Sequence, residues 1–205
     1  MEQKITRAFN FDVRAENNEQ NGDFVTGQPI VFDARTDLGY FDEVIERGAL
    51  DNTDLRDVRF LINHNTDMIP LARSRNNNEN STMQMSVNDE GMGIRVNLDT
   101  ENNQDARALY SAIKRGDITG MSFMFSINDD EWEDLESEHP VRHIREIGKV
   151  FEVSAVTFPA YEQTSITARD CVEALESAKA TLESEKRAVQ LAELQSKLEA
   201  FKNEH

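Results

Sequence analysis

The hydrophobic and polar positions divide the chain into two parts with different periods. Up to about residue 167, short apolar runs alternate with polar turns rich in Gly, Asn and Asp, which is typical of β-strands. One run of helical spacing interrupts them at residues 103–116, and Gly116 is well placed to end that helix. Beyond this part the chain contains no Gly or Pro and is rich in Ala, Glu, Lys and Leu. The pattern predicts a strand-rich domain over residues 1–167 and a helical tail over residues 168–205.

Two pairs of apolar runs predict β-hairpins. The runs at residues 9–15 and 24–33 flank a polar loop, and those at 83–87 and 92–98 flank the turn sequence NDEG. Short polar connections of this kind join antiparallel strands.

The apolar positions of the tail follow heptad-like spacing. They form two stripes in different phases: Val172, Leu175, Leu182 and Val189, then Leu191, Leu194, Leu198 and Phe201. Such spacing predicts a long amphipathic helix that docks on another surface or pairs with a second copy as a coiled coil.

The stretch GMSFMF places a serine inside an apolar strand. Successive side chains of a strand point to opposite faces, so Ser122 stands opposite Phe123 and Phe125, which can anchor the strand in the core. Gly120 just before it lets another backbone approach closely. Taken alone, this segment fits an ordinary strand serine bonded to a carbonyl, or a nucleophile held on a rigid element.

A serine nucleophile requires a base that takes its proton, and His64 is the best placed of the four histidines. His64 follows Val58, Phe60 and Ile62 at alternating positions, so we expect it to continue their apolar stripe at the edge of the core. A core-edge histidine satisfied by a carbonyl is the alternative interpretation.

Glu152 lies within an apolar strand, where a carboxylate is costly without a partner. Alternation puts Glu152 on the same face as Val150 and Ser154. Its partner can be a histidine, as in a catalytic triad, or a nearby arginine such as Arg142 or Arg145.

Charge and composition narrow the classes of partner and cofactor. A net charge of −17 over 205 residues disfavours nucleic acid and anionic membranes. The lone Cys171 excludes an internal disulfide and fits a reducing compartment. Because the chain has no long apolar stretch, we predict neither a signal peptide nor a membrane span. The acidic segment 129–139 lacks metal-ligand spacing and is interpreted as a solvated loop, so we predict neither a metal nor a cofactor.

Four segments in order resemble the caudovirus prohead protease family, the serine proteases that mature tailed-phage capsids. They are GQPIVFDARTDLGYFDEVIERGAL, VRFLINHNTDMIPLARS, LYSAIKRGDITGMSFMF and VRHIREIGKVFEVSAVTFPAY, and together they cover roughly residues 5 to 168. The resemblance implies an α+β, β-rich fold related to the herpesvirus assemblin proteases, with a closed β-barrel-like sheet surrounded by helices.

The resemblance also implies the roles of the site residues. Ser122 matches the family's nucleophile, His64 its general base, and Glu152 the position of the third triad member. Along the chain the order is histidine, serine, glutamate, which differs from the orders in chymotrypsin, subtilisin and the α/β-hydrolases. The geometry of the three side chains therefore has to establish the triad. Backbone amides near Gly120, or the guanidinium of Arg73 or Arg142, are candidates for the oxyanion site.

The function implied is that of a maturation endopeptidase inside the assembling procapsid in the host cytoplasm. Its substrates would be scaffold segments, the major capsid protein and the chain itself. Assemblin relatives dimerise, so the resemblance also suggests a homodimer. A non-catalytic assembly or scaffolding protein on a protease-like fold is the alternative. An esterase is disfavoured because the chain has no G-x-S-x-G elbow.

Overall fold

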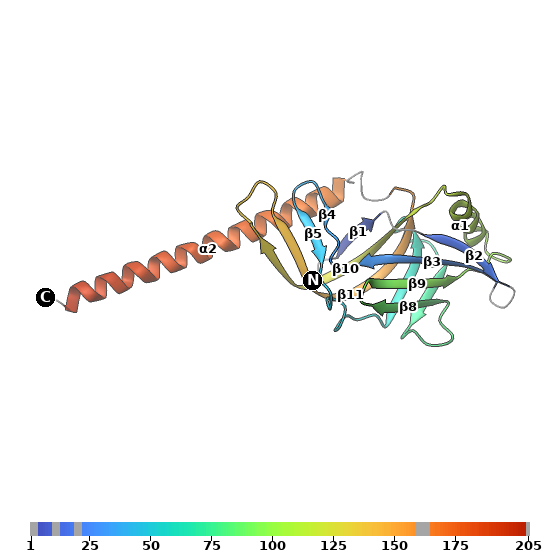
Figure 1. Ribbon diagram of the computed structural model, residues 1–205, viewed down its shortest axis with the longest axis horizontal. Helices are drawn as coiled ribbons and strands as arrows, with labels where there is room; N and C mark the ends of the chain where they lie inside the picture. Colours follow the sequence, from blue (N-terminus) through green and yellow to red (C-terminus); the bar gives the residue numbers. More distant parts are fainter. Residues whose placement is uncertain (1–3, 10–12, 19–21, 159–164, 204–205) are drawn as a thin grey trace.

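Alternating apolar residues build two β-sheets, and one helix packs against each end of the strand-rich body (Figure 1). A computed structural model describes residues 4–9, 13–18, 22–158 and 165–203. The seven-stranded sheet contains β1 (Ile5–Phe9), β4 (Thr36–Asp37), β5 (Asp42–Ile45), β6 (Asp57–Ile62), β7 (Ala72–Arg75), β10 (Gly120–Glu133) and β11 (Val141–Val156). The four-stranded sheet contains β2 (Arg14–Asn18), β3 (Gly22–Val31), β8 (Met83–Asn88) and β9 (Gly91–Asn97).

The two sheets and the first helix share one hydrophobic core. Phe123 and Phe125 of β10 meet apolar side chains from the second sheet, such as Ile30 and Met92, in this core. Removing this apolar surface from water is the main force that holds the two sheets together. The result is an α+β, strand-rich fold, as the sequence predicts.

The large sheet is branched rather than closed. Its main strand order is β1-β10-β11-β5-β4, and the other partner of β11 is β6, which in turn pairs with β7. The two parallel partners β5 and β6 pair with different parts of β11, the first near Arg142 and the second near Val153. In the described part of the chain neither sheet closes on itself, so the expected closed barrel is replaced by two open sheets.

The hairpin of β8 and β9 forms where the sequence predicts it, and its turn needs a glycine. Gly91 has φ +147°, and a Cβ there would lie 2.0 Å from the carbonyl oxygen of Ile30. The earlier hairpin also forms, between β2 and β3. The run predicted as its first strand, residues 9–15, instead divides between β1 and β2, which belong to different sheets, and residues 10–12 lie outside the described part.

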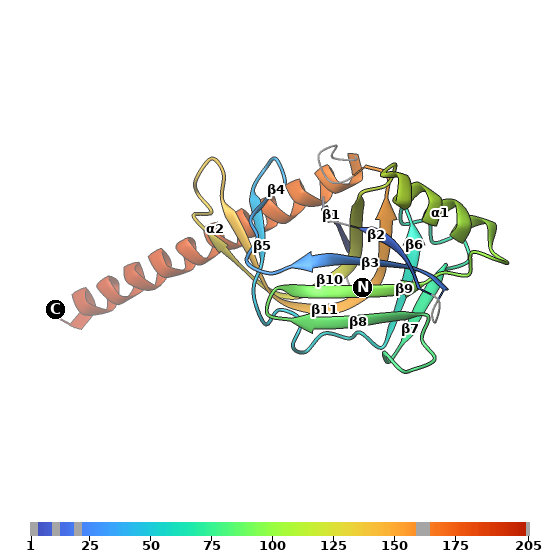
Figure 2. The same cartoon turned by 45° about the vertical axis from the view of Figure 1, so that its right-hand side comes forward.

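Helix α1 (Gln104–Arg115) has a capping residue at each end. The side chain of Asn103 accepts hydrogen bonds from the backbone N–H groups of Asp105 and Ala106, and Gly116 ends the helix in the left-handed conformation at φ 78°. Figure 2 shows α1 with β6 and β7 at the end of the molecule remote from the free end of α2.

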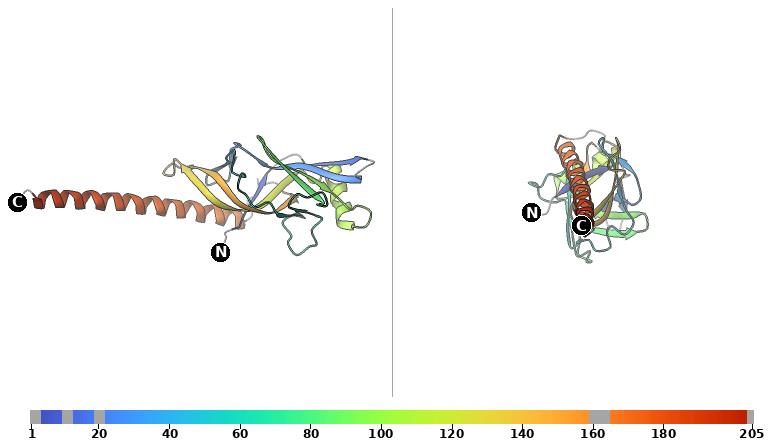
Figure 3. Two further views of the ribbon diagram at one scale, coloured as in Figure 1. Left: turned by 90° about the horizontal axis from the view of Figure 1, so that it is seen from below. Right: turned by 90° about the vertical axis from the view of Figure 1, so that its left-hand side faces the viewer.

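Helix α2 (Ser165–Asn203) is docked near its start and projects into solvent beyond (Figure 3). Cys171 packs with Leu38 and Phe41, and Leu175 and Trp132 contact the same cluster. Farther along, Leu191, Leu194 and Leu198 are 55–62% exposed. Of the first predicted stripe, Leu175 docks on the strands but Val189 is 59% exposed. The three described leucines of the second stripe face solvent. None of the helices in the described part is long and apolar enough to span a membrane.

Candidate active site

The antiparallel pairing of β10 and β11 places the polar residues of both strands on one face. Ser122 lies opposite Ser154, and Met124 lies opposite Glu152. Residues directly opposite in such a pair project to the same side of the sheet. Phe123 and Phe125 are fully buried, with ring centroids 4.8 Å apart, and they anchor the strand as predicted.

A β-bulge at Phe151 resets the alternation of β11. Met124 pairs with Glu152, but the next residue, Phe125, pairs with Val150, so Phe151 is the extra residue. Val150 therefore shares the face of Phe125, in the core, and Glu152 shares the face of Ser154. The prediction that Glu152 and Val150 lie on one face is wrong because a bulge shifts the phase of side chains by one residue.

His64 does not continue the apolar stripe of β6. Val58 and Phe60 are fully buried, but the strand ends at Ile62, and Asn63 and His64 have φ of 50° and 57°. Two successive non-glycine residues in the left-handed region are uncommon and indicate a position determined by surrounding contacts. The turn carries the His64 side chain, which is 23% exposed, away from the predicted stripe and over β11.

Glu152 and His64 form a direct hydrogen bond. His64 Nδ1 lies 2.5 Å from Glu152 Oε1, and the carboxylate is only 3% exposed. The second carboxylate oxygen, Oε2, accepts a hydrogen bond of 2.6 Å from the Ser154 hydroxyl. The interpretation of Glu152 as an arginine partner is therefore not supported, because the two candidate arginines bind other carboxylates, Asp130 and Glu131.

Ser154 is a member of this cluster that the sequence does not single out. Besides its bond to Glu152, its hydroxyl oxygen accepts the backbone N–H of His64 at 3.1 Å. Its position two residues after Glu152 on a strand places both side chains on one face. That spacing is the only local signal, and the contact with His64 depends on residues 90 positions apart.

Ser122 is fully buried, and its hydroxyl points to β1. Its Oγ donates a hydrogen bond of 2.7 Å to the carbonyl oxygen of Arg7. Within the described residues, no hydrogen bond joins Ser122 to His64. The structure thus places the serine next to the His64–Glu152 pair, on the neighbouring strand, with its hydroxyl turned away.

The family model for caudovirus prohead serine protease matches residues 9–179, most of the chain. The chain belongs to the caudovirus prohead serine protease family. It is also similar to the prohead protease of Enterobacteria phage HK97, with 27% identity over 138 residues. That match covers 66% of this chain and 56% of the phage HK97 protein, so the chain spans little more than half the length of this relative. No solved structure matches.

Arg73 and Arg142, the two arginines predicted as candidates for the oxyanion site, each bind a carboxylate. Arg73 on β7 donates from Nε and Nη2 to the two oxygens of Asp57, at 2.6 and 2.8 Å. This hydrogen bonding lowers the pKa of the Asp57 carboxyl. Arg142 on β11 donates from Nε to Asp130 at 2.7 Å. Gly120 pairs with Val156 at the start of β10, two residues before Ser122.

A second buried cluster holds β1 beside β10. Arg7 donates from Nε and Nη2 to the two oxygens of Glu43, at 2.5 and 2.8 Å, and both side chains are 3% exposed. Arg142 Nη1 lies 3.8 Å from the same carboxylate. Burial alone would lower the pKa of Arg7, but the charge and hydrogen bonds of Glu43 raise it above its ordinary value.

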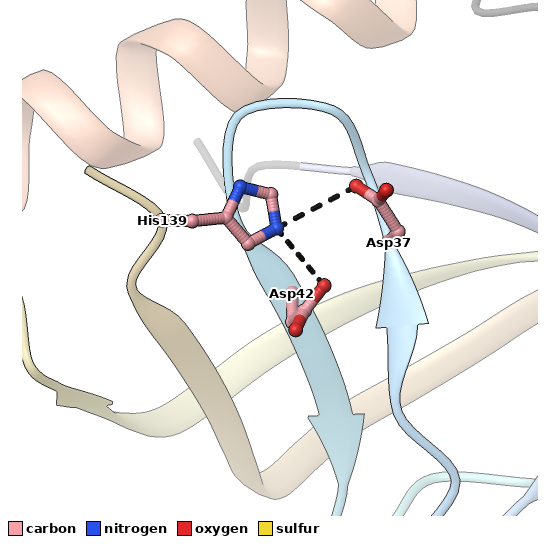
Figure 4. A group of neighbouring side chains, drawn as sticks. All are labelled: Asp37, Asp42 and His139. Atoms are coloured by element: carbon pink, nitrogen blue, oxygen red, sulfur yellow. Dashed lines mark hydrogen bonds and ion pairs between the residues drawn. The ribbon is translucent and has the colours of Figure 1, made fainter. Parts of the chain in front are cut away.

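A third polar group lies at the surface, where His139 meets the hairpin of β4 and β5 (Figure 4). Its Nε2 lies 3.0 Å from Asp42 Oδ1 and 3.6 Å from Asp37 Oδ1. The sequence predicts a solvated loop at residues 129–139, but β10 extends to Glu133 and pairs with β11 along this part. His139 therefore links the loop between these two long strands to the β4–β5 hairpin.

Proposed function

We propose that this chain is a serine endopeptidase of capsid maturation, with Ser122 as nucleophile, His64 as general base and Glu152 as the acid that orients it. The observation that carries the proposal is the 2.5 Å bond between His64 Nδ1 and Glu152 Oε1, next to the strand that presents Ser122. When Nδ1 donates to a carboxylate, Nε2 carries the lone pair that accepts a proton.

The register of β10 and β11 supports this role for Ser122. Ser122 lies opposite Ser154, and Cβ atoms of opposite residues are about 4.5–5.5 Å apart. Ser154 in turn contacts both His64 and Glu152. The proposal requires a rotation about χ1 of Ser122 that turns its hydroxyl from the Arg7 carbonyl on β1 toward His64.

The reaction is acyl transfer. Ser122 Oγ bonds to the carbonyl carbon of a peptide while its proton moves to His64 Nε2. Collapse of the tetrahedral intermediate breaks the C–N bond, and the same proton passes to the leaving amine. Water then attacks the acyl-enzyme by the reverse sequence of proton transfers. Glu152 stabilises the imidazolium that forms in both steps.

Access to Ser122 requires a change at β1. This strand pairs antiparallel with β10, from Ile5 opposite Phe125 to Phe9 opposite Met121. The Arg7 carbonyl oxygen accepts the hydrogen bond of the Ser122 hydroxyl. A substrate in extended conformation can add to the edge of β10 in the same way once β1 leaves. The structure described is, in this proposal, the closed state.

The proposed substrates are the major capsid protein and scaffold segments inside the procapsid, together with the chain itself. The family, and the name of the phage HK97 relative, prohead protease, support this assignment. The projecting part of α2 is proposed as a scaffold-contacting element. Deletion of residues 187–205 should therefore reduce incorporation into particles; unchanged incorporation would exclude this role.

One observation favours the second candidate, a non-catalytic assembly protein: Ser122 is buried and bonded to a backbone carbonyl. Co-expression of a Ser122→Ala variant with the cognate capsid protein distinguishes the two. We expect cleavage to fall by at least about 10³-fold while particles still assemble. Ser126→Ala is the matched control, because Ser126 is also buried, four residues along the same strand. Cleavage that persists in Ser122→Ala, or is lost equally in both variants, would contradict the nucleophile assignment.

A further inference from the structure

Ser154 connects the acid and the base of the cluster. The side chain is fully buried on β11, between Ser122 on one neighbouring strand and the end of β6 on the other. Its hydroxyl makes two hydrogen bonds: it donates to Glu152 Oε2 at 2.6 Å and accepts the backbone N–H of His64 at 3.1 Å. One small side chain thus holds two other residues.

The bond to Glu152 satisfies a buried charge. An ionised carboxylate accepts through two oxygens; Oε1 binds the imidazole and Oε2 binds Ser154. Without a donor at Oε2, that oxygen would be desolvated without a partner, at 3% exposure of the side chain. The carboxylate would then also be free to turn about χ3, away from His64.

The bond to the His64 backbone holds an uncommon conformation. His64 and Asn63 both have positive φ, and the N–H of Asn63 binds the carbonyl of Ala155 at 3.0 Å. The N–H of His64 binds the Ser154 hydroxyl in the same way, so two successive amides of the turn are tied to β11. These contacts determine where the imidazole lies.

We propose that Ser154 is a positioning residue that fixes the Glu152 carboxylate and the turn of His64 in one mutual orientation. The effect of Ser154 on catalysis rests on the proposed function. Its role in orienting Glu152 and His64 does not. The Ser154 hydroxyl proton is directed to Glu152 and its oxygen accepts the His64 amide, so it is placed to orient other groups rather than to attack a substrate.

The first test measures the His64–Glu152 bond directly, in the full chain. The chain has four histidines, so proton NMR of protein labelled with ¹⁵N-histidine resolves the Nδ1–H proton of His64. We expect a far-downfield resonance that Glu152→Gln removes and that Ser154→Ala shifts upfield or broadens. Ser154→Thr, which keeps the hydroxyl, should retain it, and Ser122→Ala should leave it in place. An unchanged resonance in Ser154→Ala would overturn the proposal.

The second test measures cleavage of the cognate capsid protein. Loss of one hydrogen bond to a buried charge should lower kcat by about 10- to 100-fold in Ser154→Ala, with KM unchanged and partial recovery in Ser154→Thr. Circular dichroism melting of each variant controls for folding. A change of KM with kcat unchanged would overturn a positioning role.

The two proposals fail in different ways. If the resonance responds to Ser154→Ala but wild-type protein cleaves nothing, the positioning role stands and the peptidase assignment fails. If cleavage depends on Ser122 but neither the resonance nor the rate responds to Ser154→Ala, the peptidase assignment stands and the positioning role fails.

Discussion

Two buried polar clusters each include residues of β11, and they differ in the chemistry of the groups that bind their carboxylate. Near its start, Arg142 meets Glu43, which binds Arg7; near its end, Glu152 binds His64 and Ser154. Glu43 and Glu152 are equally buried, at 3% exposure. Glu43 binds guanidiniums, which keep their proton, whereas Glu152 binds an imidazole, which can exchange one.

The comparison shows that burial of a carboxylate does not by itself indicate its use. The Glu43 cluster links β1 to β5, and through Arg142 to β11, by charges that stay fixed, and so it holds β1 beside Ser122. The Glu152 cluster leaves the imidazole 23% exposed, within reach of solvent. The first arrangement suits stability and the second suits proton transfer.

The largest effect should come from Glu152→Gln. The amide cannot stabilise an imidazolium, and the loss of a triad acid lowers kcat by about 10⁴-fold in serine proteases, so we expect a decrease of that order. Cleavage of the cognate capsid protein in a time course measures it. Glu43→Gln, compared in protein that is folded at the assay temperature, should change kcat far less. An equal loss in both variants would remove the distinction between the clusters.

The next effect should be on stability, in Glu43→Gln. Removing one partner of a buried ion pair leaves an uncompensated charge on Arg7, which typically costs about 3–5 kcal/mol of unfolding free energy. Urea denaturation followed by circular dichroism measures the change. The matched variant Glu133→Gln alters an exposed carboxylate and should lie within about 0.5 kcal/mol of wild type. A Glu43→Gln protein as stable as wild type would show that the first cluster is not structural.

A smaller effect concerns the thiol of Cys171, which lies where α2 docks near the first cluster. Burial raises the pKa of this thiol. A raised pKa leaves less thiolate at pH 8, so alkylation by iodoacetamide should be at least about 10-fold slower in folded than in urea-unfolded protein. Mass spectrometry follows the reaction. Equal rates would mean that the start of α2 is not docked in solution.

The smallest effect should come from Arg73→Gln. Arg73 is half-buried and its guanidinium binds Asp57, so we expect cleavage to stay within about twofold of wild type. Arg75→Gln on the same strand is the control. A loss of about 100-fold in Arg73→Gln alone would instead place this guanidinium at the oxyanion site.

Much of the fold follows from local patterns. The hairpin at residues 83–98 and the ends of α1 depend on glycine, asparagine and the spacing of apolar residues, all of which act over a few residues. The anchoring of Ser122 by Phe123 and Phe125 likewise follows from alternation on one strand. The resemblance to a family then selected Ser122, His64 and Glu152 from the remaining polar residues.

The sequence by itself determined which residues are apolar and most of the elements they form, and its resemblance to a family predicts Ser122, His64 and Glu152 as site residues. Only the tertiary structure decided that His64 turns over β11, that Phe151 forms a bulge, that Ser154 joins Glu152 to His64 and that Ser122 binds the Arg7 carbonyl. The physical reason is the separation along the sequence between the residues that interact. Alternation has a period of two and is lost at one bulge or one left-handed residue. The buried bonds of Arg7 to Glu43 and of Ser122 to Arg7 join residues 36 and 115 positions apart.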